Sequence, residues 1–232
     1  VPTSSLARES DFVLFTNAGP EIGVASTKAF TTQLAGLMLL ALSLAKSRDL
    51  NPMLRTRVVT GLRTLPEVIN ETLELKNKIL EIAPEIASKD NALFLGRGMF
   101  YPIAKEGALK LKEISYIHAE AYPAGELKHG PLALIDEDMP VIALAPESEI
   151  AEKLVSNLEE VKARGGTIYV FADPSVTMDV KNGALIKMPK CDFLLTPIVY
   201  TIPLQLLSYE VALLRGTDID QPRNLAKSVT VE

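Results

Sequence analysis

Three ionisable side chains, Glu106, Lys110 and Glu113, recur at spacings of four and three residues in a segment with a helical pattern. At about 100° per residue, these spacings place them on one flank of the helix, beside its apolar arc. A carboxyl that is partly desolvated there has a shifted pKa, as general acid–base catalysis requires. A half-exposed helix with one Glu106–Lys110 ion pair is the simpler interpretation of the spacing alone.

The other residues of this segment divide into a buried face and a solvated face. One arc of roughly 140° is apolar and predicts the buried face. Lys105 and Lys112 point to the opposite side and are interpreted as solvated charges. The apolar arc consists of Ile103, Ala104, Gly107, Ala108, Leu111 and Ile114.

The sequence contains two histidines, His118 and His129. A buried, hydrogen-bonded structural histidine is the default interpretation of either. His129 is the stronger catalytic candidate because it follows Pro123 and Gly125 in a predicted loop, where catalytic groups concentrate. The His and Cys residues lack the spacing of a metal site, so we expect no metal.

Two short segments border predicted helices. Gly96-Arg97-Gly98 joins a strand to a helix, and a tight turn and an anion-binding loop fit it about equally well. Tyr101 stands where a dinucleotide fingerprint would need its third glycine, which excludes that motif. Ser26 or Thr27 caps another helix. Ser26 could instead present its hydroxyl to a polar ligand, but the spacing favours capping.

Composition limits the class of protein. The 232 residues, 47% of them hydrophobic, suit one large or two small domains with a substantial core. The formal net charge of −5 argues against nucleic acid as the main partner. A single cysteine, Cys191, indicates a reducing, cytoplasmic compartment. No signal peptide is visible, and prolines interrupt the apolar segment 194–214, which favours a core helix over a membrane span.

The first part of the chain has the pattern of one strand and several helices. Residues 11–16 (DFVLFT) have the apolar run of a buried strand, and a helix that is apolar on most sides follows at about 26–46. One strand cannot cover that helix, so we expect the segments that pack against it to lie in the second half of the chain or upstream of Val1. Residues 51–88 predict two helices with a break near Pro66.

From residue 92 onward, strands alternate with helices. This alternation predicts the α/β class, with a doubly wound parallel sheet covered by helices on both faces. The helix of Glu106 follows the first strand, and further helices are predicted at 148–164 and 197–214. The strands are predicted at 92–95, 140–145, 167–172 and 184–188.

These patterns divide the chain into four parts. The last part has no helical or strand period, and a solvated tail is its simplest interpretation. The uncovered apolar helix indicates an incomplete first domain, and hence a fragment or a processed chain. The parts are the C-terminal portion of a first domain at 1–48, a helical connector at 49–90, a complete second domain at 91–215 and a tail at 216–232.

Three groups of motifs are distinctive: EIGVASTKAFTTQ, the segment from GRG through EGALKLKEISYIHAEAY to AGELKHGPLALI, and the terminal PRNLAKSVTVE. Over essentially the whole chain they resemble the isomerase half of the glutamine–fructose-6-phosphate aminotransferase (glucosamine-6-phosphate synthase) family. The resemblance implies two sugar-isomerase (SIS) domains, each a flavodoxin-like doubly wound sheet. It also implies a cofactor-free enzyme that converts fructose 6-phosphate and ammonia to glucosamine 6-phosphate.

The resemblance implies roles for the helix residues. Glu113 resembles the base that moves a proton between C1 and C2 of the sugar. Lys110 resembles the cation that stabilises the enolamine oxygen or relays a proton, and Glu106 resembles the residue that orients Lys110. Such a base works only if its acidity is tuned towards the working pH, which partial burial achieves.

Five further residues resemble functional positions of the family. His129 resembles the ring-opening residue, which reaches the site from the neighbouring subunit of a homodimer. Lys227 resembles the lysine that forms a Schiff base with the open-chain sugar, which requires some neutral amine. Val24, Ser26 and Ala226 resemble sugar contacts.

Two features of the family are missing from the sequence: the glutamine-hydrolysing domain and the Ser-x-Ser-Gly-Glu-Thr type of phosphate loop. We therefore expect the chain alone to be inactive and its parent protein to be active. A related SIS enzyme that deglycates or deaminates fructosamine phosphates would share most of these residues. A non-catalytic phosphosugar-binding module is disfavoured, because it needs neither the proton shuttle of Glu113 and His129 nor the imine-forming Lys227.

Overall fold

The computed structural model describes residues 2–46, 51–146 and 149–228. Its centre is a sheet of five parallel strands in the order β2-β1-β3-β4-β5, which is the flavodoxin-like order. The three central strands are buried along most of their length because helices cover both faces. The strands are β1 (Asn91–Gly96), β2 (His118–Pro123), β3 (Pro140–Ala145), β4 (Thr167–Ala172) and β5 (Gly183–Lys187).

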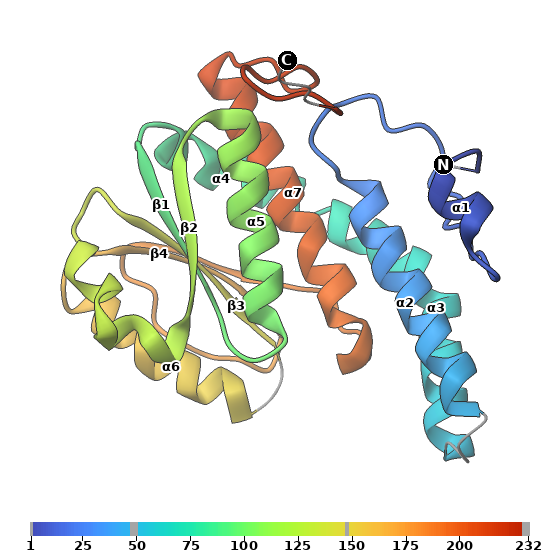
Figure 1. Cartoon of the computed structure of the whole chain (residues 1–232). Helices are drawn as coiled ribbons and strands as arrows, with labels where there is room; N and C mark the ends of the chain where they lie inside the picture. Colours follow the sequence, from blue (N-terminus) through green and yellow to red (C-terminus); the bar gives the residue numbers. More distant parts are fainter. Residues whose placement is uncertain (1, 47–50, 147–148, 229–232) are drawn as a thin grey trace.

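Helices form a layer on each side of this sheet (Figure 1). On one side α5 (Phe100–Ser115), α7 (Thr196–Arg215) and α4 (Lys76–Ala87) pack together. On the other side α6 (Glu149–Lys162) contacts β3 and β4. Alternate strand residues feed two separate hydrophobic cores, one on each face. The predicted doubly wound α/β class is confirmed.

The helix α5 is held tightly against the sheet and α7. All six residues of the predicted apolar arc are buried. Gly107 is required in this arc, because a Cβ there would lie 2.6 Å from Leu204 Cδ1 and 2.9 Å from Phe94 Cε1. The helix ends at Tyr116, which adopts a left-handed conformation with φ of 64°. This packing fixes the orientation of the flank that carries Glu106, Lys110 and Glu113.

The N-terminal helices lie to the side of the sheet (Figure 1). They are α1 (Ser5–Glu9), α2 (Lys28–Lys46) and α3 (Pro52–Leu73). The first turns of α2 pack against the core formed by α5 and α7, through Phe30 and Leu34. The second half of the chain therefore supplies part of the cover that was predicted for α2, while later residues such as Leu37 stay exposed.

By length and composition alone, α2 and the segment Phe193–Arg215, which contains α7, are apolar enough to cross a membrane. Within the protein, 61% of the apolar window of the second segment is buried. The prediction that α7 is a core helix is therefore confirmed.

The predicted strand at 11–16 is wrong. These residues form no strand, and Phe12 is 95% exposed. A strand needs a neighbour to pair with its backbone N–H and C=O groups. None of the five strands that the structure describes pairs with this segment.

The predicted helix break near Pro66 is also wrong. The helix α3 continues through Pro66, and the break lies at Glu74–Leu75, before α4. Pro66 itself is exposed, whereas its neighbour Leu65 is buried. The packed face thus holds the helix while the proline occupies the solvated side, where a lost backbone hydrogen bond costs less.

The sequence predicts a loop where the structure has the edge strand β2. This strand pairs with β1 from Asn91–His118 to Gly96–Pro123. Its terminal Pro123 is tolerated because an edge strand leaves one side unpaired. The other predicted strands and helices agree with the structure to within a few residues, except that Ser148, the predicted start of α6, lies outside the described residues.

The tail after α7 forms no helix or strand between residues 216 and 228. It is nevertheless anchored at the C-terminal end of α5, near the top of Figure 1. The Thr217 hydroxyl donates to the carbonyl of Ile114 at 2.5 Å, and the Arg223 N–H donates to the Tyr116 hydroxyl at 2.8 Å. The Arg223 guanidinium also lies 4.2 Å from the centre of the Tyr116 ring. The simple picture of a freely solvated tail is therefore wrong.

Candidate active site

Glu106, Lys110 and Glu113 form one contiguous cluster on α5. Lys110 Nζ donates a hydrogen bond to Glu113 Oε2 at 2.6 Å and lies 3.7 Å from Glu106 Oε1. Only 3% of Lys110 and 8% of Glu106 are exposed, and the Glu113 side chain is 23% exposed. The cation is thus held between two carboxylates inside the protein, a more buried arrangement than the spacing alone predicts.

Burial raises the pKa of Glu106 from 4.5 to about 7. Lys110 opposes this shift, and the negative charges of Glu113 and Glu21 add to it. Glu106 Oε1 has no hydrogen-bond partner among the described residues, since 3.7 Å to Lys110 is too long for a hydrogen bond. Near neutral pH, Glu106 therefore populates both protonation states and can accept or release a proton.

Lys110 lines a pocket with a volume of about 360 Å³. The pocket lies between α5, α7, the loop before α2 and the tail, so it gathers segments far apart in the sequence. Its size and mixed polar lining suit a small polar ligand. The polar residues of its wall are Glu21, Thr27, Lys28, Lys110, Gln205, Tyr209 and Asp220.

Glu21 fixes the loop that borders this pocket. Its Oε1 accepts hydrogen bonds from the N–H of Thr27 at 2.5 Å and from the Thr27 hydroxyl at 3.0 Å. Burial acts to raise the pKa of Glu21, but the Thr27 bonds, a backbone bond from Ala29 and the charge of Lys227 together lower it. Gln205 Nε2 donates to the Thr27 carbonyl at 3.2 Å and ties the loop to α7.

The tail crosses this loop beside the pocket. The N–H of Val24 donates to the carbonyl of Asp220 at 2.9 Å. A Cβ on Gly23 would lie 3.0 Å from Asp220 Oδ1, so the two segments are in close contact. Lys227 is exposed, and its charge acts on Glu21. The structure thus brings the tail lysine to the same side of the fold as the α5 cluster.

The three predicted sugar contacts lie on the two segments that border the pocket. Val24 is half-buried, and Ser26 and Ala226 are exposed. Of the two predicted capping residues, Thr27 is the one directly before α2, and its carbonyl accepts the first helical bonds. Ser26 therefore does not hold the position next to the helix.

His129 and Glu113 lie at opposite ends of the parallel strands. His129 ends the 3-10 helix η1 (Ala124–His129), which follows β2 at the carboxyl edge, whereas Glu113 is near the end of α5, where β2 begins. The His129 side chain is 75% exposed, and its Nε2 lies 3.9 Å from Glu126 Oε2. The contacts within the described chain do not bring His129 to the cluster.

Gly96-Arg97-Gly98 is a tight turn away from this cluster. A Cβ on Gly96 would lie 2.2 Å from the carbonyl oxygen of Phe100, and Gly98 has φ of 54°. Arg97 Nη1 donates to Asn157 Oδ1 of α6 at 3.0 Å. These constraints favour the turn over the anion-binding loop, the other interpretation of the sequence.

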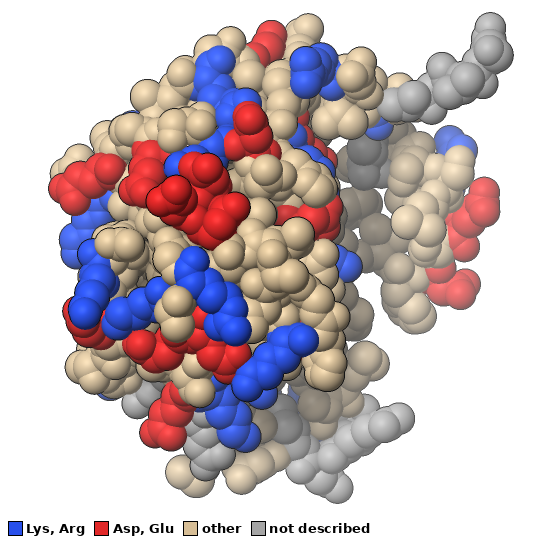
Figure 2. Space-filling view, turned by 90° about the vertical axis from the view of Figure 1, so that its left-hand side faces the viewer, with Lys and Arg blue, Asp and Glu red and all other residues tan. Residues whose placement is uncertain are grey.

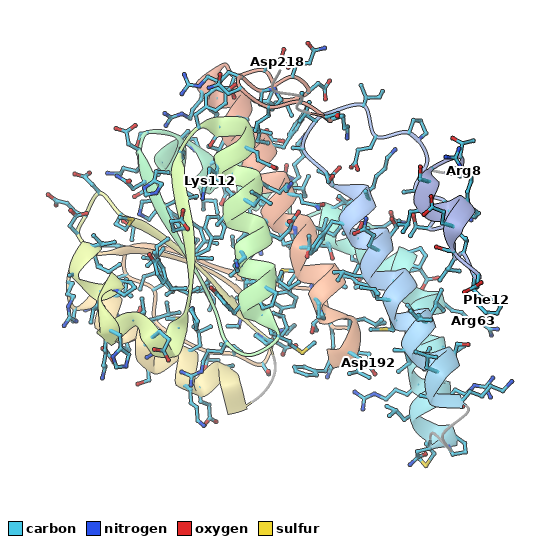
Figure 3. The ribbon with its side chains drawn as sticks, in the orientation of Figure 1. Arg8, Phe12, Arg63, Lys112, Asp192 and Asp218 are labelled. Atoms are coloured by element: carbon cyan, nitrogen blue, oxygen red, sulfur yellow. The ribbon has the colours of Figure 1, made fainter. Side chains whose placement is uncertain are left out.

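The two lysines predicted to be solvated lie outside the cluster. Lys105 is exposed, and its Nζ lies 5.7 Å from the centre of the Tyr101 ring. Lys112 lies on the side of α5 towards β2 (Figure 3), where its Nζ is 2.7 Å from Glu120 Oε1. Figure 2 shows acidic and basic side chains intermixed over the face that it displays, an arrangement unlike the basic surface that binds nucleic acid.

Sequence reasoning assigned only Lys110 to a site and missed the other six polar residues of the pocket: Glu21, Thr27, Lys28, Gln205, Tyr209 and Asp220. Gln205 gives a usable signal, because it is a polar residue inside an otherwise apolar helix. Glu21 begins the distinctive segment EIGVAS, which also contains the predicted sugar contacts Val24 and Ser26. Asp220 has no signal of its own, since its place depends on how the tail folds back.

The parallel sheet and the site at its side agree with a known domain family. A family model described as the SIS domain matches residues 1–43 and 85–215. That match extends over more than half of the chain, and the chain belongs to the SIS domain family.

Individual relatives narrow the comparison. Two proteins named glutamine–fructose-6-phosphate aminotransferase (isomerizing), from Idiomarina loihiensis and Escherichia coli (strain K12), are each 60% identical to this chain over its whole length. The chain spans 38% of the length of each. The solved C-terminal domain of the aminotransferase from Francisella tularensis is 50% identical, with a TM-score of 0.92 over 95% of this chain and 63% of that chain. A Thermotoga maritima structure titled glucosamine-6-phosphate deaminase is 27% identical, with a TM-score of 0.73 over 99% of this chain and 65% of that one.

Proposed function

We propose that this chain belongs to the isomerase unit of a glutamine–fructose-6-phosphate aminotransferase. That enzyme would convert fructose 6-phosphate and ammonia released from glutamine to glucosamine 6-phosphate. The observation that carries the proposal is the buried Lys110, held between two carboxylates at a pocket bordered by the tail. The names of the relatives that are 60% identical over the whole chain support it.

Lys227 of the tail and each side chain of the cluster have a task in this reaction. Lys227 attacks C2 of the open-chain sugar, and the imine forms with loss of water; ammonia then displaces the lysine. Glu113 takes a proton from C1 and returns it to C2, while the proton of the C1 hydroxyl passes to the nitrogen on C2 and C1 becomes the aldehyde. Lys110 stabilises the charge that develops on the C1 oxygen, and Glu106 holds Lys110.

His129 opens the sugar ring from the second subunit of a homodimer. Its exposure and its distance from the cluster of its own chain suit a residue that completes a neighbouring site. Val24, Ser26 and Ala226 contact the sugar at the junction of loop and tail. The enzyme acts in the cytoplasm without a nucleic acid or a membrane as partner. The chain consists of the end of a first SIS domain (1–48), a helical connector (49–90), a second SIS domain (91–215) and a tail (216–232).

A second function is favoured by the Thermotoga maritima structure, whose title names a glucosamine-6-phosphate deaminase. A deaminase would run the same proton transfer in reverse and release ammonia from the amino sugar. Both functions need Glu113 and Lys110, so the cluster itself does not distinguish them. They differ in the fate of nitrogen, because the aminotransferase takes it from glutamine and the deaminase releases it as ammonia.

The deciding experiment uses the full-length gene product. With fructose 6-phosphate and glutamine we expect glucosamine 6-phosphate and glutamate in equal amounts. A protein that does not use glutamine but releases ammonia from glucosamine 6-phosphate would establish the deaminase instead. The matched variants are Lys110→Met, expected to lose about 10²-fold or more in kcat, and Lys112→Met on the side of the same helix towards β2, expected to keep its activity.

A further inference from the structure

Glu106 also lines a second pocket, of about 390 Å³, which does not include Lys110. Charged residues of α5 and β2 lie around it: Lys105, Lys112 and Glu120. The first pocket, in contrast, includes Lys110 and not Glu106. The two pockets therefore meet the cluster at different members.

The cluster spans the distance between these pockets as a chain of two ion pairs, and its Glu106–Lys110 pair must shorten to hydrogen-bonding distance before a proton can pass. Glu106 Oε1 lies 3.7 Å from Lys110 Nζ, which lies 2.6 Å from Glu113 Oε2. Glu106 Oε1 is sealed from solvent and has no hydrogen-bond partner among the described residues. A buried polar atom without a partner is costly, so its retention calls for an explanation. A structural ion pair would need only one carboxylate, and Glu113 already supplies it.

We propose that Glu106 is a proton-relay residue that connects Glu113, through Lys110, to water in the second pocket. This inference rests on the proposed isomerase function. Glu113 is 23% exposed, and the sugar that it deprotonates must contact and cover that exposed part. Once it is covered, the route through Lys110 and Glu106 is the path by which protons can still exchange with solvent.

The relay moves one proton in two balanced transfers. The Lys110 ammonium gives a proton to the Glu106 carboxylate, which leaves a neutral amine and a neutral carboxylic acid. The protonated Glu113 then gives the proton taken from C1 to the Lys110 amine, which restores the ammonium and the Glu113 carboxylate. The carboxyl of Glu106, which lines the second pocket, finally rotates and releases its proton to water there.

The charges around Glu106 suit this role. Lys110 and Glu113 on α5 and Glu21 on the loop act on its carboxyl with opposite signs. Burial and these neighbours place its pKa at about 7, so it accepts and releases a proton at similar cost near neutral pH. Among the charged residues of the second pocket, Glu120 is paired with Lys112 at 2.7 Å and stands outside the cluster of Glu106, Lys110 and Glu113, which makes it a matched control.

The test measures exchange rather than rate. The full-length gene product converts fructose 6-phosphate in heavy water, and the deuterium at C2 of the product is counted per turnover. We expect Glu106→Gln to lower this fraction about tenfold relative to the unmodified enzyme, and Glu120→Gln to leave it unchanged. Unchanged exchange in an active Glu106→Gln enzyme would overturn the relay while leaving the proposed function intact. Absence of product from the unmodified enzyme would overturn the proposed function itself.

A second measurement covers the case in which Glu106→Gln does not fold. In the unmodified enzyme, the exchanged fraction should rise with pH through about 7, because only the ionised Glu106 accepts a proton from Lys110. A fraction that is constant from about pH 6 to about pH 8 would contradict the relay.

Discussion

Replacing Glu106 with glutamine should change how stability depends on pH. The pKa of Glu106 is raised from 4.5 to about 7 on folding, so between these values the folded state keeps a proton that the unfolded state has lost. The stabilisation from this proton is fully present below pH 4.5 and is lost as the pH rises through about 7. Each pH unit in this window lowers the free energy of unfolding by about 1.4 kcal/mol, or about 3 kcal/mol in all.

The glutamine variant cannot ionise and therefore escapes this loss. Its free energy of unfolding, relative to the unmodified protein, should rise by about 3 kcal/mol between about pH 4 and about pH 8. In a protein of this size, that corresponds to a relative shift in Tm of about 6–12 °C, measured by thermal denaturation across the pH range. Glu120→Gln is the control, because Lys112 lowers the pKa of Glu120 and the pH trend should be small and opposite. A constant difference between Glu106→Gln and the unmodified protein would refute the burial argument.

Three further results are expected from the full-length gene product. Borohydride added with fructose 6-phosphate should attach the sugar to Lys227, and a mass spectrum with that peptide unmodified would exclude the Schiff base. Mixing His129→Ala and Glu113→Gln protomers should restore activity in hybrid dimers, because one of their two sites is then intact; inactive hybrids would show that His129 does not act across subunits. Gly107→Val should lower the free energy of unfolding by about 1–3 kcal/mol, because its Cβ would meet Leu204 and Phe94; unaltered urea denaturation would contradict the tight α5–α7 packing.

Local patterns in the sequence predicted much of the fold. The buried arc of α5 was clear because it has a helical hydrophobic period. The strands β3 and β4 were clear because each is a short, continuous apolar run, and both are buried at every position. Residues 11–16 have the same apolar run but form no strand, because a strand depends on a neighbour that no local pattern reveals. The helix break predicted at Pro66 was wrong for a related reason. Tertiary packing of α3, which no local pattern shows, outweighs the local cost of the proline.

The candidate site was predictable only where it is local. Glu106, Lys110 and Glu113 lie on one helix, so their spacing brings them together. The contact of Val24 with Asp220 joins segments from opposite ends of the chain, and no periodicity could show it. The edge strand β2 was missed, and so was its consequence that it carries His129 to the far edge of the sheet.

The central claim is that Glu113 moves the proton from C1 to C2, and one measurement tests it directly. Fructose 6-phosphate carrying deuterium at C1 is given to the full-length gene product with glutamine, and the product is analysed by mass spectrometry and NMR. The account predicts deuterium at C2 of glucosamine 6-phosphate with the unmodified enzyme, and a loss of about 10²-fold or more in kcat with retained sugar binding for Glu113→Gln. A Glu113→Gln enzyme that forms the product at the normal rate would contradict the account.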